Sequence, residues 1–210
     1  MLLKRKFADC SNKQISALYA LCGGADCRAV SKELLCGGAK GLSTFLGGYV
    51  LECLAKGGRG RQALAIMKKY WGTMLKCGAT TFWEDFDIDW INDKTVGIDK
   101  FVSDGMSDIH GDFGKFCFKG FRHSLCHGWA SGPVSFLSRT VSGVTLLEPG
   151  FKKVRISPDD CGLEYAKTKY PTPYGVIEVE IERQISKCLT ALKRYKKTAE
   201  PAYCGFCGFV

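Results

Sequence analysis

Apolar residues in the first third of the chain recur at helical spacing, and each stripe ends at glycine. Three such stripes cover residues 15–22, 42–54 and 63–75, and they end at Gly23-Gly24, Gly57-Gly58 and Gly78. Glycine readily takes the left-handed conformation that closes a helix. The pattern predicts helices joined by short loops, which is typical of stacked antiparallel hairpins. A further helix is expected over residues 125–141, where Pro133 either bends it or marks its true start.

Beyond Glu148 the period of the pattern changes from helical to two. Apolar and charged residues alternate in residues 153–156 and 177–182, and a turn rich in proline and glycine at 171–175 separates the two runs. Alternation of this kind predicts half-buried β-strands. We therefore expect a mainly α fold with a C-terminal β part that begins near residue 149.

Three regions follow from these patterns. Residues 1–148 form the helical part, residues 149–182 the β part, and residues 183–210 a divergent tail. In the tail, the spacing of Ile185, Leu189 and Leu192 is helical again, where a β-domain would add strands.

Composition indicates a chain with a core and without a membrane span. The chain has 210 residues, of which 46% are apolar, so a sizeable core can form. Its apolar runs stop short of the roughly 18 to 20 residues that cross a bilayer, so we expect no membrane partner. The first residues lack the apolar stretch and cleavage site of a secretory signal. We expect a cytoplasmic protein, or one whose amino terminus is missing.

The formal charge of +9 is unevenly distributed. Between Glu84 and Asp112 nine acidic residues face two basic ones, so this segment carries −7 and the remainder +16. Much of the positive excess lies near the two ends of the chain, where solvated lysines are the ordinary expectation. We therefore do not expect a nucleic acid as partner.

The twelve cysteines are scattered through segments of helical pattern, which favours reduced thiols over a disulfide framework. Only Cys204 and Cys207 have the Cys-x-x-Cys spacing, and a zinc site would need a second such pair or a histidine. His123 and His127 lie four apart, but Ser124 stands where the glutamate of a His-Glu-x-x-His zinc motif would be. We expect no metal and no cofactor.

The segment after the third helix carries the most informative chemistry. In Gly78-Ala-Thr-Thr-Phe-Trp-Glu84-Asp85 small and β-branched residues lead to an aromatic ring beside a carboxylate. Such a pair can hold an acid near a sugar ring that rests on an apolar platform. Capping and packing at a helix end are the alternative roles for the same residues.

Five stretches in register resemble bacterial α-L-rhamnosidases of glycoside hydrolase family 78. The first is Gly78-Ala-Thr-Thr-Phe-Trp-Glu84, which is similar to a Gly-Ala-Thr-Thr-x-Trp-Glu motif of the family. The others are Ser43-Thr-Phe-Leu-Gly-Gly-Tyr-Val-Leu-Glu52, Ser124-Leu-Cys-His-Gly-Trp-Ala-Ser-Gly132, Leu147-Glu-Pro-Gly-Phe-Lys-Lys-Val-Arg-Ile156 and Tyr170-Pro-Thr-Pro-Tyr-Gly175. The resemblance covers roughly residues 7 to 182.

The resemblance implies a fold, a reaction and a substrate. The fold is the last portion of an (α/α)6 toroid, a ring of six helical hairpins, followed by part of a β-sandwich. The reaction is removal of terminal α-L-rhamnose from a glycoside or polysaccharide by inversion. In this chemistry a carboxylic acid protonates the leaving oxygen while a second carboxylate activates water, the two lying about 6.5 to 9.5 Å apart.

The resemblance also assigns site residues. Glu84 matches the general base, and His127 matches a histidine that lines the sugar pocket, with a buried helical histidine as the alternative. Trp83 either stacks on the sugar or packs under Glu84. Asp87 is a candidate sugar ligand, although a solvated acidic loop is the more ordinary explanation of Asp85, Asp87 and Asp89. Trp71 and Trp129 stand on apolar faces, and we expect core positions for them. The helical stripe already explains Tyr49, with a position at the pocket as the alternative.

The chain departs from the family in length. Family enzymes are several times longer, and their general acid comes from an earlier segment with no counterpart here. We therefore expect a fragment or split reading frame that lacks the acid and does not hydrolyse glycosides unaided. Its partner would be the missing N-terminal part of the enzyme, and the apolar faces of residues 15 to 75 would lack their usual neighbours.

Three other functions remain open. The chain is a non-catalytic carbohydrate-binding or interaction module, or a small zinc or redox protein that uses Cys204 and Cys207, or an inactive remnant that does not fold. Binding of L-rhamnose, metal analysis and a cooperative thermal melt distinguish them.

Overall fold

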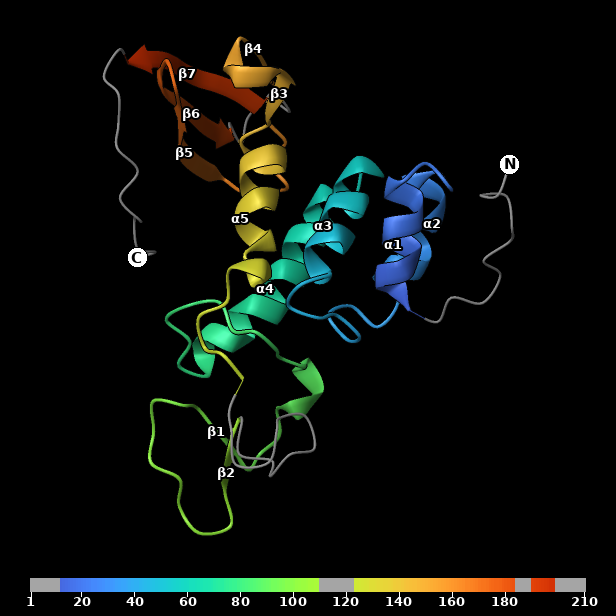
Figure 1. Ribbon diagram of the computed structural model, residues 1–210, viewed down its shortest axis with the longest axis vertical. Coiled ribbons are helices and arrows are strands. Elements are labelled where there is room, and N and C mark those ends of the chain that lie inside the picture. Colours follow the sequence, from blue (N-terminus) through green and yellow to red (C-terminus); the bar gives the residue numbers. More distant parts are fainter. Residues whose placement is uncertain (1–11, 110–122, 184–189, 199–210) are drawn as a thin grey trace. The chain divides into compact units, whose positions relative to one another are not determined.

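The computed structural model describes residues 12–109, 123–183 and the backbone of 190–198, and the chain divides into two compact units. Unit 1 comprises Met1–Ser135 and unit 2 comprises Phe136–Val210. Figure 1 labels the helices and strands of both units.

Four helices form the body of unit 1. They are α1 (Lys13–Leu21), α2 (Cys27–Leu35), α3 (Gly47–Lys56) and α4 (Gly60–Lys76). Helix α1 packs on α2 and α3, and α3 packs on both α2 and α4 (Figure 1). The loops between α1 and α2 and between α3 and α4 are short, so the predicted arrangement of helix, short loop and helix is confirmed.

Helix α2 was not predicted, because its apolar face is narrow. Only Ser31 and Leu34 of its nine residues are buried, so the hydrophobic stripe is too weak to stand out. Its start is nevertheless encoded locally. The carboxylate of Asp26 accepts hydrogen bonds from the backbone N–H groups of Arg28 (2.8 Å) and Ala29 (3.1 Å), which is the usual arrangement of an N-cap.

The core of unit 1 ties the helices to the segment that follows them. Val50, Leu51 and Leu54 of α3 and Tyr70 of α4 are fully buried, and so are Trp83 and Phe86 beyond α4. The hydroxyl of Tyr70 donates hydrogen bonds to the carbonyl oxygens of Leu42 (3.3 Å) and Phe86. Its ring lies edge-on to that of Phe86, with centroids 5.1 Å apart. The segment on both sides of Glu84 is therefore anchored to the helices by buried aromatic rings, each of which contributes roughly 1.5–3 kcal/mol when fully buried.

Short elements follow α4 in unit 1. They are a 3-10 turn, η1 (Ile88–Trp90), two short parallel strands, β1 (Thr95–Val96) and β2 (Ser107–Asp108), and a second 3-10 turn, η2 (Gly128–Ala130). Helix α5 (Gly132–Phe136) then begins, and a π-helical turn (Leu137–Val141) continues it. The helix predicted over residues 125–141 therefore starts at Gly132, so Pro133 marks its true start. Proline is tolerated in a first turn because the N–H it lacks has no partner there.

Unit 2 contains two antiparallel sheets. Strands β3 (Val144–Glu148) and β4 (Lys153–Ile156) pair with each other. Strands β5 (Tyr165–Thr172), β6 (Gly175–Arg183) and β7 (Thr190–Thr198) form the second sheet in that order. Ile177, Val179 and Ile181 of β6 are buried, and they alternate with glutamates, as expected for a half-buried strand.

Two expectations for the β part need correction. Strand β3 begins at Val144, ahead of the predicted start near residue 149, because its side chains become exposed after the first residues and the alternation is hidden. Of the three residues whose spacing predicted a helix, Ile185 and Leu189 lie outside the described residues, and Leu192 lies in strand β7. The backbone of β7 pairs with β6 over eight register positions. Hydrogen bonds to the edge of β6 outweigh the weak local preference for a helix. The predicted toroid and sandwich stay predictions, because the described elements form a mainly helical unit and two small sheets.

Candidate active site

Gly78 turns the chain out of α4 toward the segment that carries Glu84. Its φ is +90°, in the left-handed region, and a Cβ atom there would lie 2.6 Å from Oδ1 of Asp99. Both facts require glycine at this position. The first residue of the Gly-Ala-Thr-Thr-Phe-Trp-Glu stretch is therefore a structural requirement.

Two stretches that are 40 residues apart in sequence lie side by side at Glu84. The backbone N–H of Glu84 donates to the carbonyl oxygen of Ser124 (2.8 Å), and the N–H of His127 donates to that of Phe82 (2.7 Å). The hydroxyl of Thr81 donates to the carbonyl oxygen of Leu125. These bonds fix the segment of His127 against the segment of Glu84.

The Glu84 side chain is held at one oxygen. Its Oε2 accepts a hydrogen bond from the backbone N–H of Ser124 at 2.8 Å, and the residue is half-buried. Within the part of the chain that the structure describes, Oε1 accepts no hydrogen bond from protein. A carboxylate with one fixed and one available oxygen can bind a water molecule in a defined position.

A third stretch joins the site through the carbonyl oxygen of Glu84. This oxygen accepts hydrogen bonds from the hydroxyl of Thr44 and from the indole Nε1 of Trp129 (3.3 Å). Thr44 belongs to the Ser43–Glu52 stretch and Trp129 to the Ser124–Gly132 stretch. Three of the stretches that resemble the rhamnosidase family therefore meet at one residue.

Aromatic rings continue from His127 toward α3. The imidazole of His127 stacks on the indole of Trp129, with centroids 3.9 Å apart and planes at 16°. The same indole stacks with Phe45 at 5.4 Å and 23°, and Phe45 contacts Tyr49 edge-on at 6.4 Å. The expectation that Trp129 is a core residue is wrong, because 46% of its surface is exposed. Tyr49, at 37% exposure, is not a core residue either.

Trp83 lies in the core, and Asp87 caps a turn with one of its carboxylate oxygens. Trp83 is fully buried and lies edge-on to Phe86, with centroids 6.0 Å apart, so its ring has no exposed face in this structure. Oδ1 of Asp87 accepts the backbone N–H of Asp89 at 2.9 Å, which caps η1. Trp71 is buried as predicted, and its Nε1 donates to the carbonyl oxygen of Ala130 (3.2 Å).

The acidic residues near Glu84 have local partners. Oδ1 of Asp85 accepts the backbone N–H of Phe86 (2.9 Å), and its Oδ2 lies 3.8 Å from Nε2 of His123. Asp89 pairs with Lys40 at 2.8 Å, and this carboxylate raises the pKa of the Lys40 ammonium group. These contacts agree with the solvated acidic loop that was the alternative for Asp85, Asp87 and Asp89.

The Ser43–Glu52 and Ser124–Gly132 stretches approach each other closely at Gly48 and Gly132. A Cβ atom built on Gly132 would lie 2.7 Å from Cα of Gly48, and one built on Gly48 would lie 3.0 Å from Cα of Gly132. No side chain fits between two backbones at this distance. Sequence analysis missed this contact and the role of Trp129, although both glycines and the tryptophan belong to the quoted stretches.

The described residues contain no group of three or more histidine, cysteine, aspartate or glutamate side chains arranged to hold a metal ion. Cys204 and Cys207 lie outside the described residues. Among the helices that the structure describes, none is both long and apolar enough to span a bilayer.

Two comparisons with known proteins found similarity to rhamnosidases. The family described as bacterial alpha-L-rhamnosidase C-terminal domain matches residues 143–193. The crystal structure of a GH78 family rhamnosidase of Bacillus sp. GL1 is similar, with 25% sequence identity and a TM-score of 0.59. The similarity covers 81% of this chain but only 16% of that one. No curated protein sequence matches the chain.

Proposed function

Starting from the similarity of this chain to the C-terminal portion of bacterial α-L-rhamnosidases, we propose that it supplies the general base of an inverting rhamnoside hydrolase. Glu84 is that base. The observation that carries the proposal is the convergence of three separate stretches on Glu84, which is bonded through its backbone N–H, its backbone oxygen and its carboxylate.

The proposed step is the activation of a water molecule. The N–H of Ser124 holds Oε2 of Glu84, and Oε1 accepts a proton from the water that attacks the anomeric carbon of rhamnose. The leaving oxygen takes its proton from a carboxylic acid on the opposite face of the sugar, about 6.5 to 9.5 Å away. That acid comes from a region of the rhamnosidase fold that this chain does not contain.

His127 is the proposed sugar ligand of this chain. Its backbone is fixed to Phe82 and its ring to Trp129, so the imidazole nitrogens have a defined direction from which to bind a sugar hydroxyl. Trp83 and Asp87 support the site indirectly. Trp83 fills the core next to Glu84, and Asp87 shapes the turn that follows.

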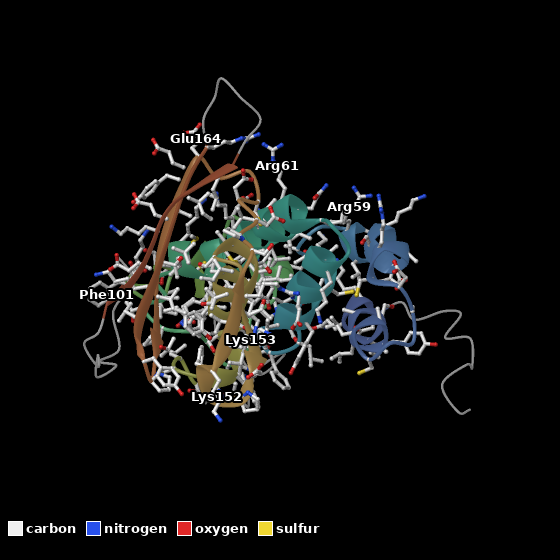
Figure 2. The ribbon with its side chains drawn as sticks, turned by 90° about the horizontal axis from the view of Figure 1, so that it is seen from above. Arg59, Arg61, Phe101, Lys152, Lys153 and Glu164 are labelled. Atoms are coloured by element: carbon white, nitrogen blue, oxygen red, sulfur yellow. The ribbon has the colours of Figure 1, made fainter. Side chains whose placement is uncertain are left out.

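The proposed partner is the rest of a rhamnosidase toroid. Ile15, Phe45 and Leu75 are exposed to 43%, 45% and 64%, although such residues normally face a neighbour. Phe101, labelled at the edge of Figure 2, is fully exposed. Further helical hairpins would cover these side chains and would also bring the acid to Glu84.

Sugar binding by the purified chain tests the proposal. We expect saturation-transfer NMR to detect binding of L-rhamnose but not of its mirror image D-rhamnose, which has the same composition and polarity. His127→Ala should weaken this binding. Absence of any preference for L-rhamnose in a chain that melts cooperatively would refute the assignment of the site.

A second assay separates binding from catalysis. An aryl α-L-rhamnoside should not be hydrolysed by the chain alone, because the acid is absent. Turnover by the chain that disappears in Glu84→Gln would show that the acid lies within the 210 residues, and it would overturn that part of the proposal. Failure of the chain to melt cooperatively would favour the inactive remnant.

A further inference from the structure

We propose that Trp129 is a positioning residue that holds Glu84 and His127 in one fixed arrangement. This inference rests on the proposed function, since it explains how the base and the sugar ligand of that site are kept together. It also rests on geometry that can be tested without any sugar.

Trp129 contacts both residues through different parts of its indole. Its single donor, Nε1–H, is directed to the backbone oxygen of Glu84 at 3.3 Å. One ring face lies on the imidazole of His127, nearly parallel to it, with centroids 3.9 Å apart. A movement of the indole therefore displaces the base segment and the imidazole together.

The position of Trp129 is in turn set by its neighbours. It lies in η2, where the N–H of Ala130 donates to the carbonyl oxygen of His127 at 3.2 Å. Phe45 stacks with the same indole, and Phe45 directly follows Thr44, which also donates to the carbonyl oxygen of Glu84. Thr44 and Trp129 thus hold one oxygen from two different stretches.

Burial of the Trp129 side chain does not explain its position against Glu84 and His127. Trp129 is 46% exposed, whereas Trp71, which makes a similar bond from its indole to the carbonyl oxygen of Ala130, is 5% exposed. A side chain that is held mainly by the hydrophobic effect would turn more of its ring inward. Trp71 is therefore a matched control, because its indole makes the same kind of bond from a buried position in the core.

The test uses the full chain and three substitutions. Trp129→Phe keeps a ring that can stack on His127 but removes the donor to Glu84. Trp129→Leu removes both contacts. Trp71→Phe removes a buried indole bond to Ala130, the residue after Trp129, and leaves the contacts of Trp129 with Glu84 and His127 in place. Tyr49→Leu is a second control, because it removes an aromatic ring that contacts Phe45 edge-on and leaves the bond and the stacking of Trp129 in place.

The first measurement is the NMR spectrum of the His127 imidazole. The chain has three histidines, so His127→Gln assigns the resonance. We expect a ring proton shifted upfield by the indole, retained in Trp129→Phe and in both controls and lost in Trp129→Leu. An unchanged resonance in Trp129→Leu would overturn the proposal, whether or not rhamnose binds.

The second measurement is the affinity for L-rhamnose. Trp129→Phe should weaken binding about two- to tenfold, the range for one net hydrogen bond, and Trp129→Leu should weaken it more. Both controls should bind as the parent chain does, even where Trp71→Phe lowers the melting temperature. Equal losses in Trp129→Phe and Trp71→Phe would mean a merely structural role. If the parent chain binds no rhamnose, the proposed function fails, and the imidazole resonance alone decides the role of Trp129.

Discussion

Replacing Gly132 with alanine tests the glycine contact that joins the stretches at the site. The new Cβ atom would lie 2.7 Å from Cα and 3.4 Å from N of Gly48. Both are backbone atoms, so no rotation of a side chain can relieve the overlap. Carbon atoms pack best about 3.5–4.0 Å apart, and the two backbones would have to separate by roughly 1 Å.

The cost follows from the size of this overlap. Overpacking of a tight contact typically costs about 1–3 kcal/mol. Alanine regains at most about 1 kcal/mol over glycine through helix propensity, and less at the first residue of a helix. We expect Gly132→Ala to lower the free energy of unfolding by about 1–2 kcal/mol, which corresponds to a melting temperature lower by roughly 2–8 °C. Binding of L-rhamnose should weaken as well, because Phe45 and Trp129 move apart.

Gly72→Ala is the matched control. Gly72 lies inside α4, and among the described residues no heavy atom comes within 4 Å of a Cβ atom built there. The same substitution should therefore stabilise the chain by about 0.5–1 kcal/mol. Urea unfolding followed by tryptophan fluorescence reports on unit 1, since Trp71, Trp83, Trp90 and Trp129 all belong to it. Equal stability of Gly132→Ala and the parent chain, with Gly72→Ala stabilised, would refute the close approach of Gly48 and Gly132.

Three further predictions concern stability. Tyr70→Phe should cost about 1–3 kcal/mol in urea unfolding, because the buried carbonyl oxygens of Leu42 and Phe86 lose their shared donor; an unchanged unfolding midpoint would contradict this. Burial, helped by Asp159, raises the pKa of the Cys161 thiol to about 12, so above pH 9 the unfolded chain loses this proton while the native chain keeps it. The stability of unit 2 should then fall as pH rises from about 9 toward 12, and hydrogen exchange of β6 amides should show a smaller fall in Cys161→Ala. Asp26→Ala should destabilise α2 by about 1 kcal/mol, whereas Asp26→Asn should retain the cap, as judged by amide exchange in α2.

Helices with a broad apolar stripe could be predicted from the sequence, and those with a narrow one could not. The stripes in α3 and α4 include the buried residues Val50, Leu54 and Tyr70. In α1 the stripe marks the helix but not its buried face, which consists of Gln14, Ser16, Ala17 and Ala20, whereas Ile15 is exposed. Helix α2 exposes most of its surface, so only the Asp26 cap marks it. Strand β7 is a different case, because its conformation depends on pairing with β6 and a local pattern does not record such a partner.

The residues of the candidate site could also be predicted only in part. The sequence by itself determined which residues are candidates, since Glu84 and His127 stand in stretches that resemble the rhamnosidase family. Trp129 stands in the same stretch as His127, but its apolar character suggested a core position. Its role became visible only when the fold placed its indole against Glu84 and His127.

What the sequence determined about this protein is therefore local: helical periodicity, the glycine after α4, the alternation in β6 and the carboxylate of Glu84. The tertiary structure alone decided which stretches meet, namely that Thr44, Ser124 and Trp129 all bond to Glu84 and that Gly48 lies against Gly132. The physical reason is that periodicity and capping act within a few residues, whereas these contacts join positions 40 or more residues apart. They depend on the packing of whole helices, which no short stretch of sequence specifies.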